Sequence, residues 1–361
     1  MRVKTAPLTR NLALPAAGVA GVLLLSCMAT PPASVLAFDG GRVLAADLVE
    51  AERVELLMSR LQPELLRLLP DTAFQDLDVW IQDTPSLYSF NTDASADAEG
   101  LWSPTHQRIM LSRHADHIER TLAHELTHAA LGDSWALLPG SMEEGLADHV
   151  SGSLCSSGAA RLRAGRLSSA CLATGGVSLE VDVRRREDTG SEAWSANVRL
   201  KGEADGTDPM DVFRLAAGLS STRLESGAKR GFYGLAFVAV SRIVDRGGYA
   251  ELQRLCLSAA ESGLEHVPAE WILQAAGLDE RPETWRRAAA GAMGARELGE
   301  LVRMYPSFVT DAVRSYLGEG GGELEELEVV IGLREGGARV CLEDLPDLRA
   351  RVALEIQAPA L

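Results

Sequence analysis

The spacing of apolar residues predicts two amphipathic helices in the first half of the chain. Between Leu48 and Leu69, apolar residues recur every three or four positions, which gives a helix one apolar face. A second stripe of this kind runs from Ile118 to Leu131, and Gly132 then supplies a residue that commonly ends a helix. We therefore expect both segments to pack one face onto a core.

Elsewhere the pattern changes to the short apolar runs that are typical of strands. Leu77 to Gln82 is one such run, and a turn at Gly100 to Pro104 leads to another at Arg108 to Ser112. Further strands are expected at 177–185, 193–200, 327–333, 338–342 and near 352–356. Because the runs at 327–333 and 338–342 flank Glu335-Gly336-Gly337, they predict a hairpin, to which the last run can add a third strand.

The second predicted helix carries His124-Glu125-Leu126-Thr127-His128. Histidines four residues apart on a helix project from one face, so both imidazoles can reach one metal ion. The carboxylate of Glu125 lies beside that face, where it can take a proton from a metal-activated water. The motif predicts a zinc site with a general base, and the alternative is a pair of ordinary surface histidines.

A catalytic zinc site also needs a third protein ligand and an open position for water. Ser141 to Asp148 predicts a further helix, on which Glu144 and Asp148 share a face. We expect Glu144 to bind the metal and Asp148 to accept the free ring N–H of a ligating histidine. In the alternative, a capping box, Glu144 bonds back to the Ser141 backbone N–H. Glu143 is then a fallback ligand or a partner of the helix dipole.

These residues resemble the gluzincin zinc peptidases, the group that includes the thermolysin-like enzymes and related aminopeptidases. Glu144-Gly145-Leu146-Ala147 is similar to their third-ligand segment, and Asp148 matches the acidic residue that supports a histidine in thermolysin-like members. The short gap between the two helices looks closer to compact peptidase MA-like domains. The resemblance covers about residues 75–255. It implies one Zn²⁺ ion and a peptide or protein substrate.

The resemblance also implies two features of the substrate site. In these enzymes, the strand before the metal helix is an edge strand that pairs with extended peptide. Arg108-Ile109-Met110-Leu111-Ser112 is the strand expected there, and an ordinary core strand is its alternative. Related domains carry a tyrosine at the start of a later apolar helix, so Tyr233 is the expected oxyanion donor unless it only packs.

The N-terminus resembles the signal peptide of a bacterial lipoprotein. Basic residues precede an apolar stretch from Asn11 to Leu25, and Leu24-Leu25-Ser26-Cys27 is similar to a lipobox, whose cysteine becomes lipid-bearing. We expect Cys27 to anchor the chain in the cell envelope, at the outer membrane because Met28 is not the aspartate of inner-membrane retention. The alternative is a secretory signal ending near Ala29 or Ala37, which gives a periplasmic or secreted protein.

The net charge limits the expected partners. The chain has a formal net charge of −16 at pH 7, and removing residues 1–26 takes away three basic side chains, which leaves −19. This acidity repels nucleic acid and anionic lipid headgroups, so membrane attachment is left to the acyl chains. Nothing in the sequence indicates an oligomeric state.

Export also determines whether the four cysteines after Cys27 are expected to be oxidised. In an oxidising compartment, the four are expected to form disulfides between Cys155 and Cys171 and between Cys256 and Cys341, which close local segments. Reduced, buried cysteines are the alternative.

Together these features predict an α+β zinc metallopeptidase of the cell envelope. A small mixed or antiparallel sheet, with an edge strand packed on the zinc-binding helix, is followed by a mainly helical subdomain. The expected divisions are a leader at 1–26, a tether at 27–48, a zinc-binding unit at 49–150, an insertion at 151–225 that can roof the cleft, a helical subdomain at 226–320 and a C-terminal β region at 321–361. The rivals are a catalytically silent envelope lipoprotein that serves in binding or structure, and an accidental motif.

Overall fold

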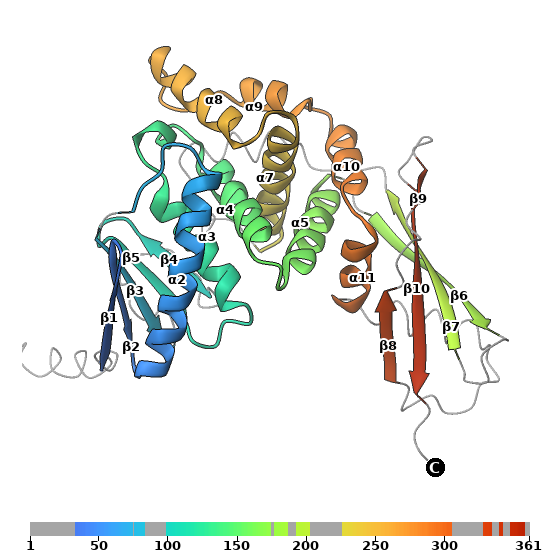
Figure 1. Ribbon diagram of the computed structural model, residues 1–361. Helices are drawn as coiled ribbons and strands as arrows, with labels where there is room; N and C mark the ends of the chain where they lie inside the picture. The colour runs from blue at the N-terminus through green and yellow to red at the C-terminus, as the bar shows by residue number, and fades with distance from the viewer. Residues whose placement is uncertain are drawn as a thin grey trace, which may run out of the picture.

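A computed structural model describes residues 33–74, 76–83, 99–174, 177–186, 193–202, 226–304, 328–333, 339–341 and 347–357. In this part of the chain, two sheets lie at opposite ends of a helical middle (Figure 1). The expected α+β class is therefore confirmed. None of the described helices is both long enough and apolar enough to cross a membrane. The expected leader and Cys27 lie outside the described residues.

The first sheet is mixed and has the strand order β1-β2-β3-β5-β4. Its strands are β1 (Ser34–Phe38), β2 (Gly41–Ala45), β3 (Leu77–Gln82), β4 (Gly100–Ser103) and β5 (Arg108–Ser112). The three central strands are parallel to one another, whereas β1 and β4 are antiparallel to their neighbours. Both antiparallel strands, β1 and β4, lie at the edges of this sheet.

The hairpin of β1 and β2 lies within the expected tether, so that prediction is wrong for residues 34–45. The chain reverses at Asp39 and Gly40, and Gly40 adopts a φ of +88°, which glycine reaches without strain. Val43, Leu44 and Ala45 are buried and join the core. The Asp-Gly pair, common in two-residue hairpin turns, was the signal in the sequence.

The strand order also corrects the expected substrate strand. Arg108–Ser112 forms β5, which pairs with β3 on one side and with β4 on the other. Its backbone groups are used on both sides, so the prediction that it is an edge strand is wrong. The edge on this side is β4, which makes up most of the segment that the sequence predicted as a turn.

Three helices follow, of which the first two pack against the first sheet and the last two carry the predicted metal ligands. They are α2 (Leu48–Leu68), α3 (Ile118–Ala130) and α4 (Gly140–Leu154). α3 packs against α4, α2, β4 and β5, and it buries Leu122 and Leu126. A short 3-10 helix, η2 (Asp133–Trp135), leads from α3 to α4. The expected helices at 48–69 and 118–131 are confirmed to within one residue at each end.

The helical middle consists of α5 (Ala159–Ala173), α7 (Ser226–Gly247), α8 (Tyr249–Glu261), α9 (Ala269–Ala276), α10 (Pro282–Gly291) and α11 (Ala295–Met304). Helix α7 packs against both α4 and α5. Trp285 is fully buried and Trp271 is partly buried against the core, as expected of packing anchors. Because α5 also packs against α10 and α11, it belongs to this core and not to an insertion.

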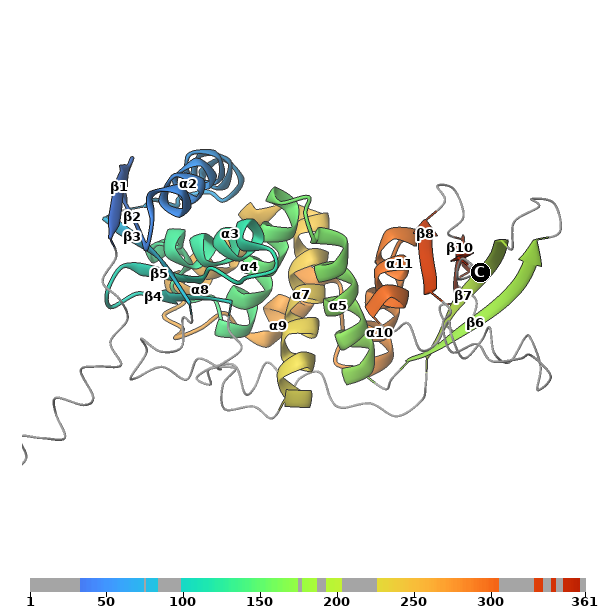
Figure 2. The same ribbon diagram turned by 90° about the horizontal axis from the view of Figure 1, so that it is seen from below.

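The second sheet joins two distant parts of the chain. Its strands are β6 (Val177–Arg186), β7 (Ala193–Gly202), β8 (Glu328–Leu333), β9 (Arg339–Cys341) and β10 (Asp347–Gln357). β7, β8 and β9 all pair with β10, so the expected hairpin of the 327–333 and 338–342 runs is wrong. β6 and β7 lie beyond α10 and α11 in both views, away from α3 and α4 (Figures 1 and 2). These two strands therefore do not roof the metal-binding helices, and residues 187–192 and 203–225 of the expected insertion lie outside the described residues.

Cys155, Cys171 and Cys256 are free and buried, so neither expected disulfide is present. Cys155 precedes helix α5, and Cys171 lies in the last turn of that helix. Its rise of about 1.5 Å per residue separates its first turn from Cys171 by roughly 18 Å. A disulfide needs Cα atoms about 4.4–6.8 Å apart. Cys256 is buried in α8, and the side chain of Cys341 lies outside the described residues.

Candidate metal site

The structure brings the three predicted metal ligands together. His124 and His128 project from α3, and Glu144 faces them from α4. The Nε2 atoms of the histidines lie 3.2 Å apart, and Glu144 Oε2 lies 3.4 Å from Nε2 of His124 and 3.7 Å from that of His128. A tetrahedral ion with bonds of about 2.0–2.1 Å separates its ligand atoms by about 3.3 Å. The three atoms therefore form a group that can hold one metal ion.

The start of α4 excludes the capping box. The helix begins at Gly140, so Ser141 lies inside its first turn and not at the N-cap. The Ser141 hydroxyl is buried and has no hydrogen-bond partner among the described residues. Glu144 faces the histidines instead. Burial raises the pKa of Glu144, but hydrogen bonds from His124 and His128 outweigh it and hold that pKa well below the ordinary value.

Each histidine is held at its second nitrogen by a carboxylate of α4. Asp148 Oδ1 lies 3.1 Å from His124 Nδ1, where the sequence predicted it. Glu143 Oε1 lies 2.8 Å from His128 Nδ1, a role that sequence reasoning missed. Its signal was the adjacent pair Glu143-Glu144, because neighbouring helical residues point about 100° apart and can serve different partners. Both contacts orient an imidazole with Nε2 toward the ligand group.

Arg166 of α5 completes this network, and no sequence pattern pointed to it. Its Nε donates a hydrogen bond to Asp148 Oδ2. Burial raises the pKa of Asp148, but Arg166 and His124 outweigh it and keep the carboxylate ionised. The Arg166 guanidinium carbon also lies 4.6 Å from the centre of the Tyr233 ring. Tyr233 is thus next to the network, and its role as oxyanion donor stays a prediction.

The carboxylates around the histidines control their protonation. Burial lowers the pKa of His124, but hydrogen bonds to Asp148 and Glu144 outweigh it and raise that pKa to about 9. The pKa of His128 is likewise raised well above its ordinary value, through Glu143 and Glu144 against the effect of burial. A metal ion entering this group has to displace protons, so its binding strengthens as the pH rises.

Glu125 is buried beside the ligand group without belonging to it. Burial raises the pKa of Glu125, and the nearby His124 and His128 oppose that effect. The backbone N–H of Trp102 in β4 donates to its carboxylate. Gly100 is so close that a Cβ there would lie 2.9 Å from Glu125 Oε1. The edge strand β4 therefore passes directly by the predicted base.

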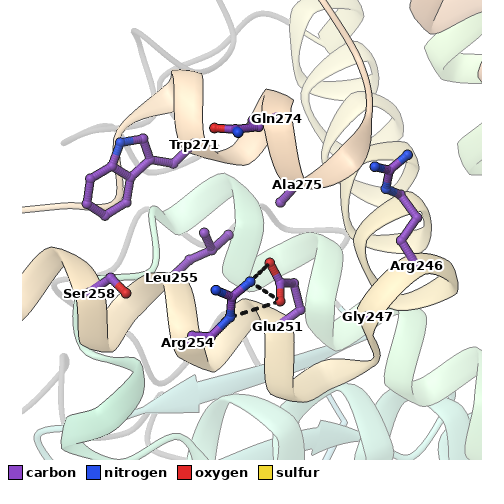
Figure 3. A pocket seen from close by; sticks show the side chains of 9 residues that line it. All are labelled: Arg246, Gly247, Glu251, Arg254, Leu255, Ser258, Trp271, Gln274 and Ala275. Atoms are coloured by element: carbon purple, nitrogen blue, oxygen red, sulfur yellow. Dashed lines mark hydrogen bonds and ion pairs between the residues drawn. The ribbon is translucent and has the colours of Figure 1, made fainter.

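A cavity of about 560 Å³ lies elsewhere, among the end of α7, α8 and α9 (Figure 3). Trp271 lines it from α9, and the Glu251–Arg254 ion pair lines it from α8. It shares no residue with the metal-ligand group. Among the residues that the structure describes, the cluster able to hold a metal is that of His124, His128 and Glu144. That cluster is therefore the candidate functional site.

No protein-family model matches the chain, and no curated protein matches it. The resemblance to gluzincin peptidases therefore stays a prediction from the sequence motifs.

Proposed function

We propose that this protein is a zinc-dependent metallopeptidase, held in the cell envelope by a lipid at Cys27. The observation that supports it most is the convergence of His124, His128 and Glu144, with the buried Glu125 beside them. Two imidazoles and one carboxylate are a ligand set of catalytic zinc sites, in which a fourth position stays open. A zinc ion bound there would supply Lewis acidity and lower the pKa of water.

The residues of the chain would then share the remaining work. The Glu125 carboxylate takes the proton of the attacking water and passes it to the nitrogen of the leaving amine. Its burial favours this exchange, because a raised pKa makes the carboxylate a better base. Asp148 and Glu143 hold the two imidazoles in place. Tyr233 is proposed to donate a hydrogen bond to the developing oxyanion.

We propose β4 as the strand that binds extended substrate. It is an edge strand of the first sheet, and its Gly100 and Trp102 lie beside Glu125. A peptide added to this edge would lie next to the base and the metal ligands. Pairing through backbone groups gives affinity without a strict sequence preference, which suits a peptidase.

Zinc content and activity of two variants test the proposal. The purified protein should hold one equivalent of zinc and cleave members of a mixed peptide library, detected by mass spectrometry. Glu125→Gln should keep the zinc and lose the cleavage, because an amide cannot take the proton. Glu144→Ala should lose both.

Two results would contradict the proposal in different ways. Cleavage that survives Glu125→Gln would show that this carboxylate is not the base. A wild-type protein that holds zinc and cleaves no peptide would favour the catalytically silent lipoprotein.

A further inference from the structure

A cavity of about 290 Å³ adjoins the metal site and is lined by three arginines, Arg120, Arg161 and Arg166. Arg120 lies four residues before His124 on the same face of α3, about 6 Å along the helix. Arg166 lines the cavity and also bonds to Asp148, which holds His124. The cavity and the metal site therefore share a wall.

Two of these arginines have guanidinium groups that no carboxylate of the described residues pairs with. Arg166 is paired with Asp148. Within the described part of the chain, neither Arg120 nor Arg161 forms an ion pair with a carboxylate. Arg120 Nε is buried there and has no hydrogen-bond partner among the described residues. Burying a charged donor without an acceptor is costly, and a ligand that accepts would remove that cost.

Two carboxylates line the same cavity and have to be weighed against these arginines. Glu99 Oε2 accepts the Thr121 hydroxyl at 3.0 Å, and Asp116 is exposed to solvent. They limit how strongly an anion is held. Neither carboxylate forms an ion pair with Arg120 or Arg161, so within the described residues both guanidinium groups stay available to a ligand.

We infer that this cavity is a subsite that binds a carboxylate of the substrate, from an acidic side chain or from the C-terminus. The inference rests on the proposed function, since it makes the cavity part of the peptide site. Guanidinium groups offer paired N–H donors that match the two oxygens of a carboxylate. A distance of about 6 Å along α3 corresponds to roughly two residues of extended peptide. The carboxylate is therefore expected within about two residues of the cleaved bond.

The test uses peptides that differ only by Glu or Gln near the cleaved bond, each with a free or an amidated C-terminus. Calorimetry measures their binding to the Glu125→Gln protein, and kcat/KM is measured with the active protein. We expect the carboxylate peptides to be preferred about tenfold. Arg120→Gln and Arg161→Gln should each reduce that preference. Arg287→Gln, which removes an exposed arginine of α10, should leave it unchanged.

The results separate the possible sources of the carboxylate. A preference for Glu over Gln that survives amidation indicates an acidic side chain, whereas a preference for the free over the amidated C-terminus, with Glu or with Gln, indicates the C-terminus. Equal binding of all four peptides would overturn the inference, as would a preference that survives the double variant Arg120→Gln/Arg161→Gln. Melting curves check that the variants are folded, and Arg161 is exposed, so its replacement should not disturb the core.

The same measurements distinguish the subsite from the proposed function. Cleavage without any preference for a carboxylate contradicts the subsite and leaves the peptidase. Carboxylate-dependent binding without cleavage of any peptide contradicts the peptidase and leaves the subsite.

Discussion

At the scale of single residues, the metal site depends on which nitrogen of each histidine is left available. Asp148 and Glu143 contact the two Nδ1 atoms, which leaves both Nε2 atoms directed to Glu144. Carboxylates in this position fix the ring orientation and make the other nitrogen a stronger ligand. The affinity for a metal should therefore depend on residues that do not touch it.

Glu143→Gln and Asp148→Asn should each weaken zinc binding by about 10- to 100-fold. The amides keep the shape of the side chain but lose the charge that makes the imidazole a better ligand. Asp148→Asn should have the larger effect, because Arg166 then loses its ion pair as well. Competition with a zinc-chelating dye measures the affinity. Glu52→Gln, at an exposed position of α2, is the control. If Glu143→Gln bound zinc as tightly as this control, Glu143 would have no supporting role.

The ligands were predictable because helical spacing is local. His124, His128, Glu144 and Asp148 all follow from residues four apart on two short helices. Arg166 reaches the site from a third helix, whose approach depends on packing between α5 and α7 that no local pattern encodes. The arginine-lined cavity likewise depends on how α3 and α5 are brought together, so it could not be predicted from the sequence.

At the scale of elements, glycines let the helices that carry the site approach one another. A Cβ on Gly145 of α4 would lie 2.6 Å from the carbonyl of Ala236 in α7. A Cβ on Gly234 of α7 would lie 2.5 Å from the backbone nitrogen of Ala170 in α5. Backbone atoms cannot turn aside as the end of a side chain can. These contacts therefore fix the spacing of α4, α7 and α5, and with it the positions of Arg166 and Tyr233.

Gly145→Ala should lower the free energy of unfolding by about 1–3 kcal/mol, because α4 and α7 have to separate. Gly152→Ala in the same helix is the matched control. Its Cβ would meet only the Leu162 side chain, at an ordinary 3.7 Å, so it should be neutral or stabilising by up to about 1 kcal/mol. Denaturant unfolding measures both variants. Equal stabilities of the two variants would show that the space beside Gly145 can accept a methyl group.

His149 connects three helices. From α4, its ring centre lies 5.9 Å from that of Phe237 in α7, and its Nδ1 lies 2.9 Å from the Tyr249 hydroxyl in α8. Burial and, to a smaller extent, the charge of Arg163 lower the pKa of His149 from 6.5 to about 4, against the opposing effect of Asp245. The folded protein therefore holds this histidine neutral at neutral pH.

This pKa shift predicts a pH dependence of stability. The pKa is lower in the folded state, so the unfolded state binds more protons between pH 6.5 and 4. The contribution of His149 is therefore complete above pH 6.5 and is lost as the pH falls towards 4. Denaturant unfolding across this range should show a steeper loss for the wild type than for His149→Gln, which has no ionisable ring. Parallel curves for the two proteins would contradict the assignment.

A strong periodic pattern predicts that an element exists, but it does not predict which elements lie beside it in the fold. The apolar stripe of α3 fixed its ends to within a residue. The runs of β3 and β5 were recognised as strands, but which strand lies at the edge depends on the pairing of β4 with β5. An alternating or apolar run shows that a strand exists and says little about the strand beside it.

At the scale of the whole molecule, the two ends are built differently. The metal-ligand group lies beside the first sheet, whose strands follow one another within residues 34–112. The second sheet pairs β7 with β10, more than a hundred residues further along the chain. Such distant pairing leaves no local signal, which explains why β6 and β7 were predicted as strands but assigned to an insertion.

Because its ligands come from both α3 and α4, a bound zinc ion should stabilise the molecule as a whole. At a free concentration of about 100 times Kd, binding should raise the free energy of unfolding by about 2.7 kcal/mol, and a chelator should reverse this. Glu125→Gln should keep the increase, because this carboxylate is not a ligand. Glu144→Ala should lose most of it. Unfolding measured with and without zinc checks each case. An equal increase in Glu144→Ala would mean that zinc binds through other side chains, and the assignment of this site would then fail.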